Sequence, residues 1–331
     1  MISLVYSYLC RMRETMSIVI PVYNRAKELP RTVASIVAQD YRPLHLILVD
    51  NNSSDSSLAV CHDLQQQFQT SDFIIEVLQQ PRAGASAARN MGLEYVKSRY
   101  MMFFDSDDVL HCDSVSRYMQ AFAEHPDADI IGSTIEFHNG IHSLGIAKAV
   151  FTTEPEAHII HGILSTQRFA ARTQLIREVG GWQEEYNGWL DWNLGLRLML
   201  RTDRIYWIKT PPVATVYLHP NSITGRNDLS GYKQFYLALQ YTRRDIAAST
   251  HKRKKRLDRL VIYRQALLAA RILYENSSND IALRTFAFRI FDEAMHDANT
   301  TCSMRLFFRF CLQYASRGGR GSGTVAQWII R

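Results

Sequence analysis

An apolar run that ends in three acids is the feature of this sequence that most constrains its fold. Tyr100–Phe104 is followed at once by Asp105, Asp107 and Asp108. A short apolar run bounded by polar residues is typical of a strand buried on both faces, and open α/β sheets bind ligands at such strand ends. Carboxylates this close repel one another. We therefore expect either a bound divalent cation or, as the alternative, an acidic turn that caps the next helix.

Composition and cysteine usage limit the class of protein. The 331 residues are 47% hydrophobic and 21% charged, as in globular proteins. No apolar run approaches the roughly 20 residues of a membrane-spanning helix. The basic residues near Met1–Cys10 follow the apolar run, an order opposite to that of a secretory signal, so a secretory signal is not expected. The first strong strand begins at Ser17, directly after Met16, so residues 1–15 are expected to be an accessory or spurious extension. The five cysteines form no C-x-x-C pair, which favours reduced thiols in a cytoplasmic protein.

Strands and helices are predicted to alternate over the first third of the chain. The predicted strands cover Ser17–Asn24, Leu44–Val49, Phe73–Leu78 and Tyr100–Phe104, and the predicted helices cover Glu28–Gln39, Ser56–Phe68 and Ser86–Val96. This alternation predicts an α/β fold with a mostly parallel sheet flanked by helices. Three of the strands end in polar residues, at Tyr23-Asn24, Asp50 and Asp105–Asp108, so we expect one polar crevice along one sheet edge.

Other nucleotide motifs are absent from the sequence. No G-x-G-x-x-G follows the first strand and no Walker loop is present, which disfavours dinucleotide dehydrogenases and P-loop NTPases. Asp50 ends a strand at a position where a carboxylate can hydrogen-bond a nucleoside. The turn Pro81–Asn90 brings two arginines to a helix start, which suits a phosphate-bearing ligand. An ordinary glycine turn with solvated arginines is the alternative.

Four segments together carry a family resemblance. They read V-Y-N at the end of Ser17–Asn24, V-D-N-x-S-x-D in Leu46–Asp55, G-x-x-x-A-R-N-x-G in Gly84–Gly92 and D-x-D-D in Phe103–Asp108. In this order they resemble the family 2 glycosyltransferases of the GT-A fold, from Met16 to about Gly225. The resemblance implies that the first half binds a nucleotide-sugar. Tyr23 and Asp50 would contact the base with Asn24 beside them, Arg89 would lie near the base or diphosphate, and Asp105 would hold the ribose or a metal-bound water.

The resemblance also implies a metal cofactor, Mn²⁺ or Mg²⁺, with Asp107 as a ligand. His219 opens an H-x-x-S-x-T stretch that resembles a family segment whose histidine joins the metal or diphosphate site, and a neutral imidazole suits that role. A histidine that only orders its loop is the alternative. Asp108 could instead cap the following helix.

The segment Gly180–Trp192 resembles the family's G-G-[FW]-D-E stretch, which precedes an acidic dipeptide at a helix start. A helix is predicted over Leu190–Arg201, and the resemblance implies that Asp191 is the general base, a role that contributes roughly 10²–10⁴-fold to rate. An acid that pairs with the helix dipole is the alternative. The family usually has two acids where this chain has Leu190-Asp191. The residues expected near the acceptor or in loops are Trp189, Trp192 and Glu184.

The chain becomes basic after Gly231, with 18 Lys+Arg against 7 Asp+Glu, whereas the residues before it carry 20 against 25. Helices are predicted over Tyr232–Ala248, Leu257–Tyr274, Ile281–Ala298 and Met304–Ala315. Either these helices pack on the catalytic part with a solvated basic face, or they contact an anionic membrane surface. Nucleic acid is not expected, because no recognisable nucleic-acid module accompanies the charge.

These observations predict a domain order and a function. We expect a catalytic domain at 16–229, a helical basic subdomain at 230–316 and a flexible tail at 317–331. Within the catalytic domain, residues 16–110 would form the nucleotide-sugar half and residues 111–229 the acceptor half, with a lid or acceptor loop over Phe151–Ile163. The predicted function is a metal-dependent inverting glycosyltransferase. It would move a sugar, with UDP as the default nucleotide, to a glycan or lipid-linked acceptor, in the cytoplasm or at the inner face of the cell membrane. A non-catalytic nucleotide- or glycan-binding module and a nucleotidyltransferase are the alternatives.

Overall fold

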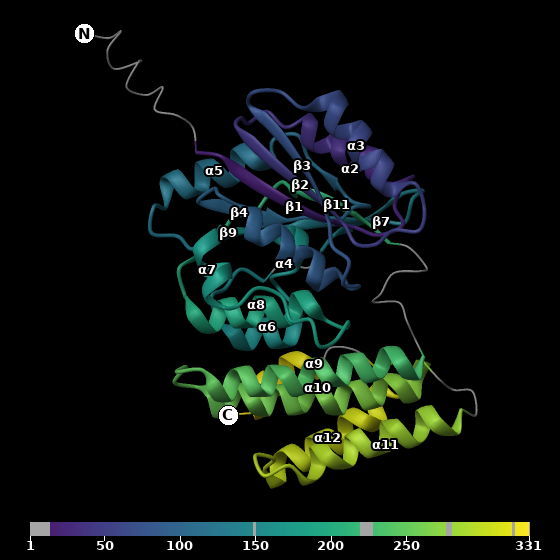
Figure 1. Cartoon of the computed structure of the whole chain (residues 1–331). Coiled ribbons are helices and arrows are strands. Elements are labelled where there is room, and N and C mark those ends of the chain that lie inside the picture. Colours follow the sequence, from purple (N-terminus) through teal and green to yellow (C-terminus); the bar gives the residue numbers. More distant parts are fainter. Residues whose placement is uncertain (1–13, 148–149, 219–227, 276–279, 320–321, 331) are drawn as a thin grey trace. The chain divides into compact units, whose positions relative to one another are not determined.

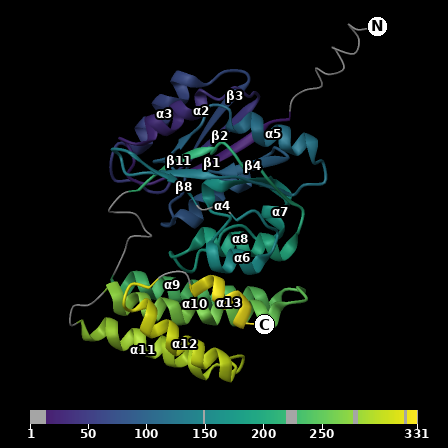
Figure 2. The same cartoon turned by 180° about the vertical axis from the view of Figure 1, so that it is seen from behind.

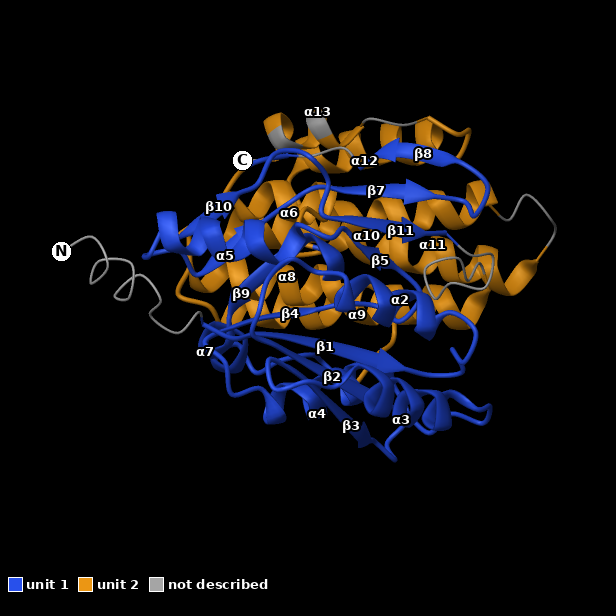
Figure 3. Ribbon diagram, turned by 90° about the horizontal axis from the view of Figure 1, so that it is seen from above, with its two compact units in different colours: residues 1–151, 165–184, 204–218 blue, residues 152–164, 185–203, 219–331 orange. Residues whose placement is uncertain are grey.

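The computed structural model describes residues 14–147, 150–218, 228–275, 280–319 and 322–330. The chain forms two compact units, coloured separately in Figure 3. The first unit takes residues up to 151, then 165–184 and 204–218, and the second takes 152–164, 185–203 and 219–331. Each unit is therefore assembled from stretches that are separate in sequence.

A mostly parallel sheet forms the centre of the first unit. Among the described residues it has seven strands in the order β10-β6-β9-β4-β1-β2-β3. The strands are β1 (Met16–Val22), β2 (Leu44–Asp50), β3 (Phe73–Gln79), β4 (Tyr100–Phe103), β6 (Ile130–Gly132), β9 (Phe169–Arg172) and β10 (Ile205–Trp207). β1 pairs in parallel with β2 and β4, whereas β9 is antiparallel to β4 and β6. The predicted fold class and the shared edge of three polar strand ends are confirmed.

Helices cover the strands of this sheet, as Figures 1 and 2 show. They are α2 (Leu29–Val37), α3 (Ser57–Phe68), α4 (Ala85–Tyr95), α5 (Ser114–Glu124) and α7 (Thr173–Glu178). β1 is buried from both sides because Ile18 and Ile20 pack in one core cluster with Val33 of α2, while Val19 faces Gly92 of α4. This is why the β1 sequence is an uninterrupted apolar run rather than an alternating one.

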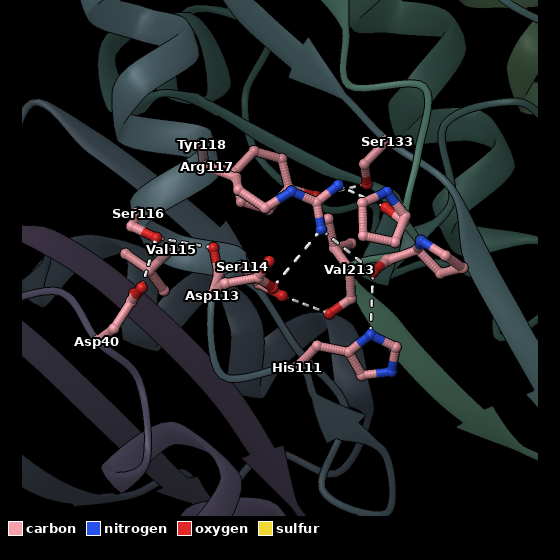
Figure 4. Close-up of polar contacts among 12 residues, drawn as sticks. Asp40, His111, Asp113, Ser114, Val115, Ser116, Arg117, Tyr118, Ser133 and Val213 are labelled. Carbon is pink, nitrogen blue, oxygen red and sulfur yellow. Dashed lines mark hydrogen bonds and ion pairs between the residues drawn. The ribbon is translucent and has the colours of Figure 1, made fainter.

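A smaller sheet extends the first unit. It has the order β5-β11-β7-β8 and contains β5 (Val109–Leu110), β7 (Ile135–His138), β8 (Ser143–Ile146) and β11 (Ala214–Tyr217). Polar contacts connect the residues just before β11 with the segment that runs from β5 into α5 (Figure 4). Ser114 Oγ donates to the Val213 carbonyl at 2.6 Å, and His111 Nδ1 lies 2.9 Å from the Pro212 carbonyl. The acidic turn between β4 and β5 is thus anchored to both sheets.

The second unit is helical. It comprises α6 (Pro155–His161), α8 (Leu190–Arg201), α9 (Leu229–Ala248), α10 (Lys254–Glu275), α11 (Ile281–His296), α12 (Cys302–Ala315) and α13 (Ser322–Ile329). Ile159 of α6 and Trp192 and Leu196 of α8 share one apolar core with α9 to α13. The predicted C-terminal helical extension is confirmed. None of the helices in the described ranges combines the length and apolar character that crossing a membrane requires.

Two local predictions in this unit were wrong. A lid or acceptor loop was expected over Phe151–Ile163, but α6 forms there and buries Ala157, His158 and Ile159. Ile159 joins the apolar core of the unit, and His158 Nε2 lies 2.8 Å from the Trp192 carbonyl of α8. A flexible tail was expected over 317–331, but α13 forms within it and buries Ala326.

Gly92 is required for α4 to approach the sheet. A Cβ built on Gly92 would lie 2.3 Å from Val19 Cγ1 and 3.2 Å from Val49 Cγ2. We expect Gly92→Ala to lower the free energy of unfolding by about 1–3 kcal/mol through overpacking. Urea denaturation measures this, with Glu94→Ala on the exposed side of α4 as the control. Equal stability of the two variants would contradict the close approach.

Candidate active site

The candidate site lies where β4, β1 and β2 end, in the first unit. Asn51 N donates to the Val22 carbonyl at 2.7 Å, and Phe104 N donates to the Val19 carbonyl at 3.0 Å, so the pairing continues to the last residues of these strands. Polar residues follow directly after each of these three strands. The carboxyl edge of a parallel sheet is the usual ligand position in this kind of fold.

Asp105 is held from two sides. The Arg89 guanidinium of α4 lies 2.6 Å from Asp105 Oδ1, and the Gln167 amide donates to Asp105 Oδ2 at 2.6 Å. Arg89 also lies over the Trp182 ring, 4.4 Å from its centroid. Charge-assisted bonds of this kind fix the orientation of the carboxylate. Contacts of Arg89 and Asp105 with a nucleotide stay predictions.

Asp107 pairs with a different arginine. Its Oδ2 lies 3.2 Å from Arg25 Nη2, and its side chain keeps 20% of its surface exposed. Arg31 donates to the Asp107 backbone carbonyl and stacks over the Tyr217 ring, 3.8 Å from the centroid. The two arginines therefore fix both the backbone and the side chain of this position.

Asp108 is buried and does not cap a helix. Its Oδ1 accepts from Tyr217 N at 2.9 Å, and its Oδ2 accepts from Gln167 at 2.6 Å. Burial and the charges of Asp105 and Asp107 raise the pKa of Asp108 well above its usual value, against the two hydrogen bonds. The residue preceding α5 is Asp113, so the capping alternative for Asp108 is wrong. Asp108 instead ties the acidic turn to β11.

Asp50 ends β2 with one carboxylate oxygen unsatisfied. Oδ2 accepts from Ser53 N at 3.3 Å, whereas the buried Oδ1 has no hydrogen-bond partner among the described residues. A buried acceptor in this state costs roughly 1–3 kcal/mol, and an N–H donor from a ligand would remove that cost. Tyr23, at the end of the neighbouring β1, is 58% exposed, so its ring is open to a stacking partner. The base contacts of Asp50 and Tyr23 stay predictions.

Asn24 connects the ends of β1 and β2. It adopts a left-handed backbone with φ of 52°, which asparagine tolerates better than most residues. Its Oδ1 accepts from Ser54 N at 2.8 Å, and its own N–H donates to Ser53 Oγ at 3.1 Å. The side-chain oxygen of Asn24 is therefore occupied within the turn, and its predicted place beside the base stays a prediction.

Asn51 organises the loop before α4, a role that the sequence analysis missed. Its amide nitrogen donates to the carbonyls of Gln80 and Arg82 at 3.1 and 2.6 Å, and its Oδ1 accepts from Gly84 N at 2.7 Å. Gly84 has a φ of 128°, which favours glycine. The asparagine of the V-D-N segment was the available signal for this contact.

Glu184 connects the G-G-W turn to the start of α4. It lies 2.9 Å from Arg82 Nη1 and accepts from Asn90 Nδ2 at 2.9 Å. Asn90 also exchanges two hydrogen bonds with the Trp182 backbone, each 2.8 Å long. The asparagine of the A-R-N motif thus has a structural role, and a sugar contact for Glu184 stays a prediction.

Asp191 lies in the first turn of α8, in the second unit. Its Oδ1 accepts from Trp192 N at 2.8 Å. Trp192 is 4% exposed and its indole donates to the His158 carbonyl at 3.2 Å, so this side chain fills the core. Trp189, half-buried with φ of 50°, stacks on Phe235 at 4.9 Å. The base role of Asp191 and acceptor contacts of the tryptophans stay predictions, and His219 lies outside the described residues.

Arg264 of α10 supports the same helix start and was not anticipated from sequence. It donates to the carbonyls of Ile159 and Ile160 at 2.6 and 3.3 Å, at the C-terminal end of α6. Its guanidinium carbon lies 4.5 Å from the Trp189 ring centroid and 4.8 Å from that of Trp192. Burial lowers the pKa of Arg264 to about 10. Helix carbonyls and aromatic faces therefore compensate the charge of this arginine.

Comparison with known proteins now identifies the family. Residues 17–181 match the model of the family described as Glycosyl transferase family 2. The chain belongs to this family.

Curated relatives match a part of this family 2 chain. It is 36% identical over 121 residues to the glycosyltransferase GlyG of Streptococcus pneumoniae serotype 4, a match that covers 36% of this chain and 38% of GlyG. It is 30% identical over 105 residues to the GalNAc(5)-diNAcBac-PP-undecaprenol beta-1,3-glucosyltransferase of Campylobacter jejuni, covering 32% of this chain and 33% of that protein. The chain thus spans well under half the length of these relatives.

Solved structures extend the likeness beyond the family 2 segment. The structure of S. aureus TarS 1–349 in complex with UDP-GlcNAc has a TM-score of 0.68 at 17% identity, covering 91% of this chain and 88% of that chain. The mannosyltransferase PcManGT from Pyrobaculum calidifontis, in complex with GDP-Man and Mn²⁺, has a TM-score of 0.55 at 13% identity, covering 92% and 88%. At these identities the likeness shows the fold, which is GT-A-like.

The acidic turn suits a hard divalent cation by its donor chemistry. Asp105 and Asp107 offer carboxylate oxygens, with 31% and 20% of their side chains exposed. In the described part of the chain, no group of three or more His, Cys, Asp or Glu is arranged to hold a metal ion. A site with one or two carboxylates is still compatible with Mg²⁺, which commonly takes its other ligands from water and substrate phosphates.

Asp245 of α9 fixes α8, the helix that carries Asp191, and gives the second unit a pH dependence. Asn193 Nδ2 donates to Asp245 Oδ2 at 2.9 Å, and Arg197 Nε lies 3.8 Å from it. Burial raises the pKa of Asp245 above 3.8, against the opposing effects of Asn193 and Arg197. The pKa of Asp245 is thus higher in the folded state than in the unfolded state. The protonated carboxyl therefore contributes to the unfolding free energy below the unfolded-state pKa, and this contribution is lost as the pH rises through the folded-state pKa.

We therefore expect the unfolding free energy of the wild type, minus that of Asp245→Asn, to fall as the pH rises above about 4. Urea denaturation at a series of pH values measures this difference. Asp63→Asn, which makes the same substitution at an exposed position of α3, is the control measured over the same range. A difference for Asp245→Asn that is constant or rises with pH would contradict the assignment.

Proposed function

We propose that this chain is a metal-dependent inverting glycosyltransferase that moves a sugar from a UDP-sugar to a hydroxyl of a glycan or lipid-linked acceptor, on the cytoplasmic side of the cell membrane. The observation that carries the proposal is the buried Asp50 Oδ1, which has no donor in the part of the chain that the structure describes and lies at the same sheet edge as the acidic turn. One half of that edge suits an N–H-bearing base, and the other suits a cation with a diphosphate.

The relatives supply the donor and acceptor classes for this proposal. TarS is described in complex with UDP-GlcNAc, and the Campylobacter relative is named as a glucosyltransferase with an undecaprenol-linked substrate. We infer that residues 16–229 form the catalytic domain, with the donor bound by 16–110 and the acceptor by 111–229. Tyr23 would stack on the base, and Asp50 Oδ1 would accept its N–H.

In the proposed reaction, the acceptor oxygen attacks the anomeric carbon of the sugar from the face opposite the diphosphate. A new C–O bond forms as the bond to the diphosphate oxygen breaks, and the configuration inverts. Asp191 takes the proton from the acceptor hydroxyl, which raises the electron density on the attacking oxygen. No covalent enzyme intermediate is required.

Asp107 would hold the cation together with His219, and Asp105 would hold the ribose or a metal-bound water beside it. When bound, Mn²⁺ or Mg²⁺ supplies Lewis-acid stabilisation of the charge that develops on the departing diphosphate. Arg89 and Gln167 hold Asp105 in place for this role, and Asp108 secures the turn to β11.

Replacement of Asp107 tests the donor half of the site. We expect Asp107→Ala to abolish the Mn²⁺-dependent rise in melting temperature with UDP-sugars and to lower turnover roughly 100-fold or more, because a cation contributes several kcal/mol. Thermal shift across a panel of nucleotide-sugars and a product assay measure the two effects. Asp63→Ala on α3 is the control, and unchanged Mn²⁺-dependent nucleotide binding by Asp107→Ala would refute the metal assignment.

Replacement of Asp191 tests the chemical step separately. Asp191→Asn keeps the shape of the side chain but removes the base, so we expect unchanged UDP-sugar binding and a rate of transfer lower by roughly 10²–10⁴-fold. Calorimetry and single-turnover product formation distinguish binding from transfer. Asp203→Asn, an exposed acid beyond the end of α8, serves as the control. Full transfer by Asp191→Asn would refute its role as base.

A further inference from the structure

Helix α12 is apolar on two opposite sides. Met304, Phe307 and Phe308 are buried in the core of the second unit. On the other side, Leu306 and Phe310 are 73% and 56% exposed. Exposed apolar side chains that lie together on a protein surface often mark an interaction site, so this outer side is a candidate docking surface.

The outer side of α12 forms a continuous stripe. Leu306, Phe310 and Tyr314 follow one another at intervals of four residues, and the rings of Phe310 and Tyr314 stack with centroids 5.6 Å apart. Arg305 and Arg309 are exposed and adjoin the stripe. We call these five residues the α12 face. Neither arginine has an ion-pair partner among the described residues.

The surroundings of the α12 face are basic in sequence. From Ala298 to Arg331 the chain has five arginines and no aspartate or glutamate. The other basic run of this unit, residues 251–256, is partly used internally, because Arg253 pairs with Glu154 and Glu156. α12 therefore carries exposed apolar residues beside two arginines, of which Arg305 donates to the Met295 carbonyl at 2.9 Å and Arg309 makes no polar contact with the described residues. α11, in contrast, exposes Phe288 on a helix that also carries Asp292 and Glu293.

We propose that the α12 face docks on the surface of an anionic lipid bilayer. Apolar side chains flanked by arginines are what an interfacial helix presents to the boundary between headgroups and acyl chains. Anionic lipid attracts each nearby basic residue, and it complements a helix that contains two arginines and no aspartate or glutamate. A second copy of the chain would bring a second set of arginines against the first, so like-charge repulsion disfavours it. This inference does not depend on the proposed reaction.

Vesicle binding tests the proposal without any turnover. The full chain is centrifuged with vesicles of phosphatidylcholine alone or mixed with phosphatidylglycerol, and the bound fraction is measured. We expect binding only to the mixed vesicles and less of it at high salt. Phe310→Ser should weaken partitioning about tenfold through lost apolar burial, and Arg309→Gln about fivefold through lost attraction. Both substitutions are at exposed positions, so thermal melts should match the wild type.

Phe288→Ser on α11 is the matched control, because it removes an aromatic side chain of similar exposure, 49% against 56% for Phe310. It should leave vesicle binding unchanged, and a loss equal to that of Phe310→Ser would overturn the assignment to α12. Absence of wild-type binding to the mixed vesicles would also overturn it. So would light scattering that shows a dimer abolished by Phe310→Ser, since the face would then join two copies.

Discussion

The parallel pairing of β1 with both β2 and β4 is the constraint on which the rest of the first unit depends. It brings three polar strand ends to one edge, and at this edge lies the D-x-D-D turn, whose three carboxylates are close in sequence. Repulsion between like charges in a partly buried site costs free energy, and each of the three carboxylates has different partners that offset this cost. Asp105 receives a buried arginine, Asp107 a half-exposed one, and Asp108 only N–H donors. The turn therefore combines two ion-paired, partly exposed carboxylates, Asp105 and Asp107, with the buried Asp108, whose pKa is raised.

The buried strands of the main sheet and the polar residues that follow them could be predicted from the sequence. The apolar runs at residues 17–22 and 100–104 predicted buried strands because neither side of β1 or β4 meets water. The polar residues after them correctly marked the sheet edge that these strands share. The G-x-x-x-A-R-N-x-G motif predicted the start of α4. Physical reasons for its residues came only with the structure: Gly92 permits close packing against Val19, and Asn90 holds the Trp182 backbone.

Long-range polar contacts could not be predicted in this way. Gln167 joins Asp105 and Asp108 across about sixty residues of sequence, and no periodicity or motif marks it. The burial of α6 was equally hidden, because its charged and histidine-rich sequence resembles a loop until Arg253 and Trp192 are placed beside it. The same holds for Arg264, whose partners are backbone carbonyls and aromatic rings rather than acids. Such contacts depend on which elements become neighbours, and a single sequence does not contain that information.

The interleaved order of the two units has a consequence for how the protein is made. The segment with Asp191 leaves the ribosome well before residues 219–331, yet Trp192 and Leu196 share their apolar core with helices of that later segment. Until those helices emerge, the nascent α8 can pack on α6 but lacks the part of its core that α9 to α13 supply. The core around the helix of the candidate base is therefore completed only after that helix has been synthesised.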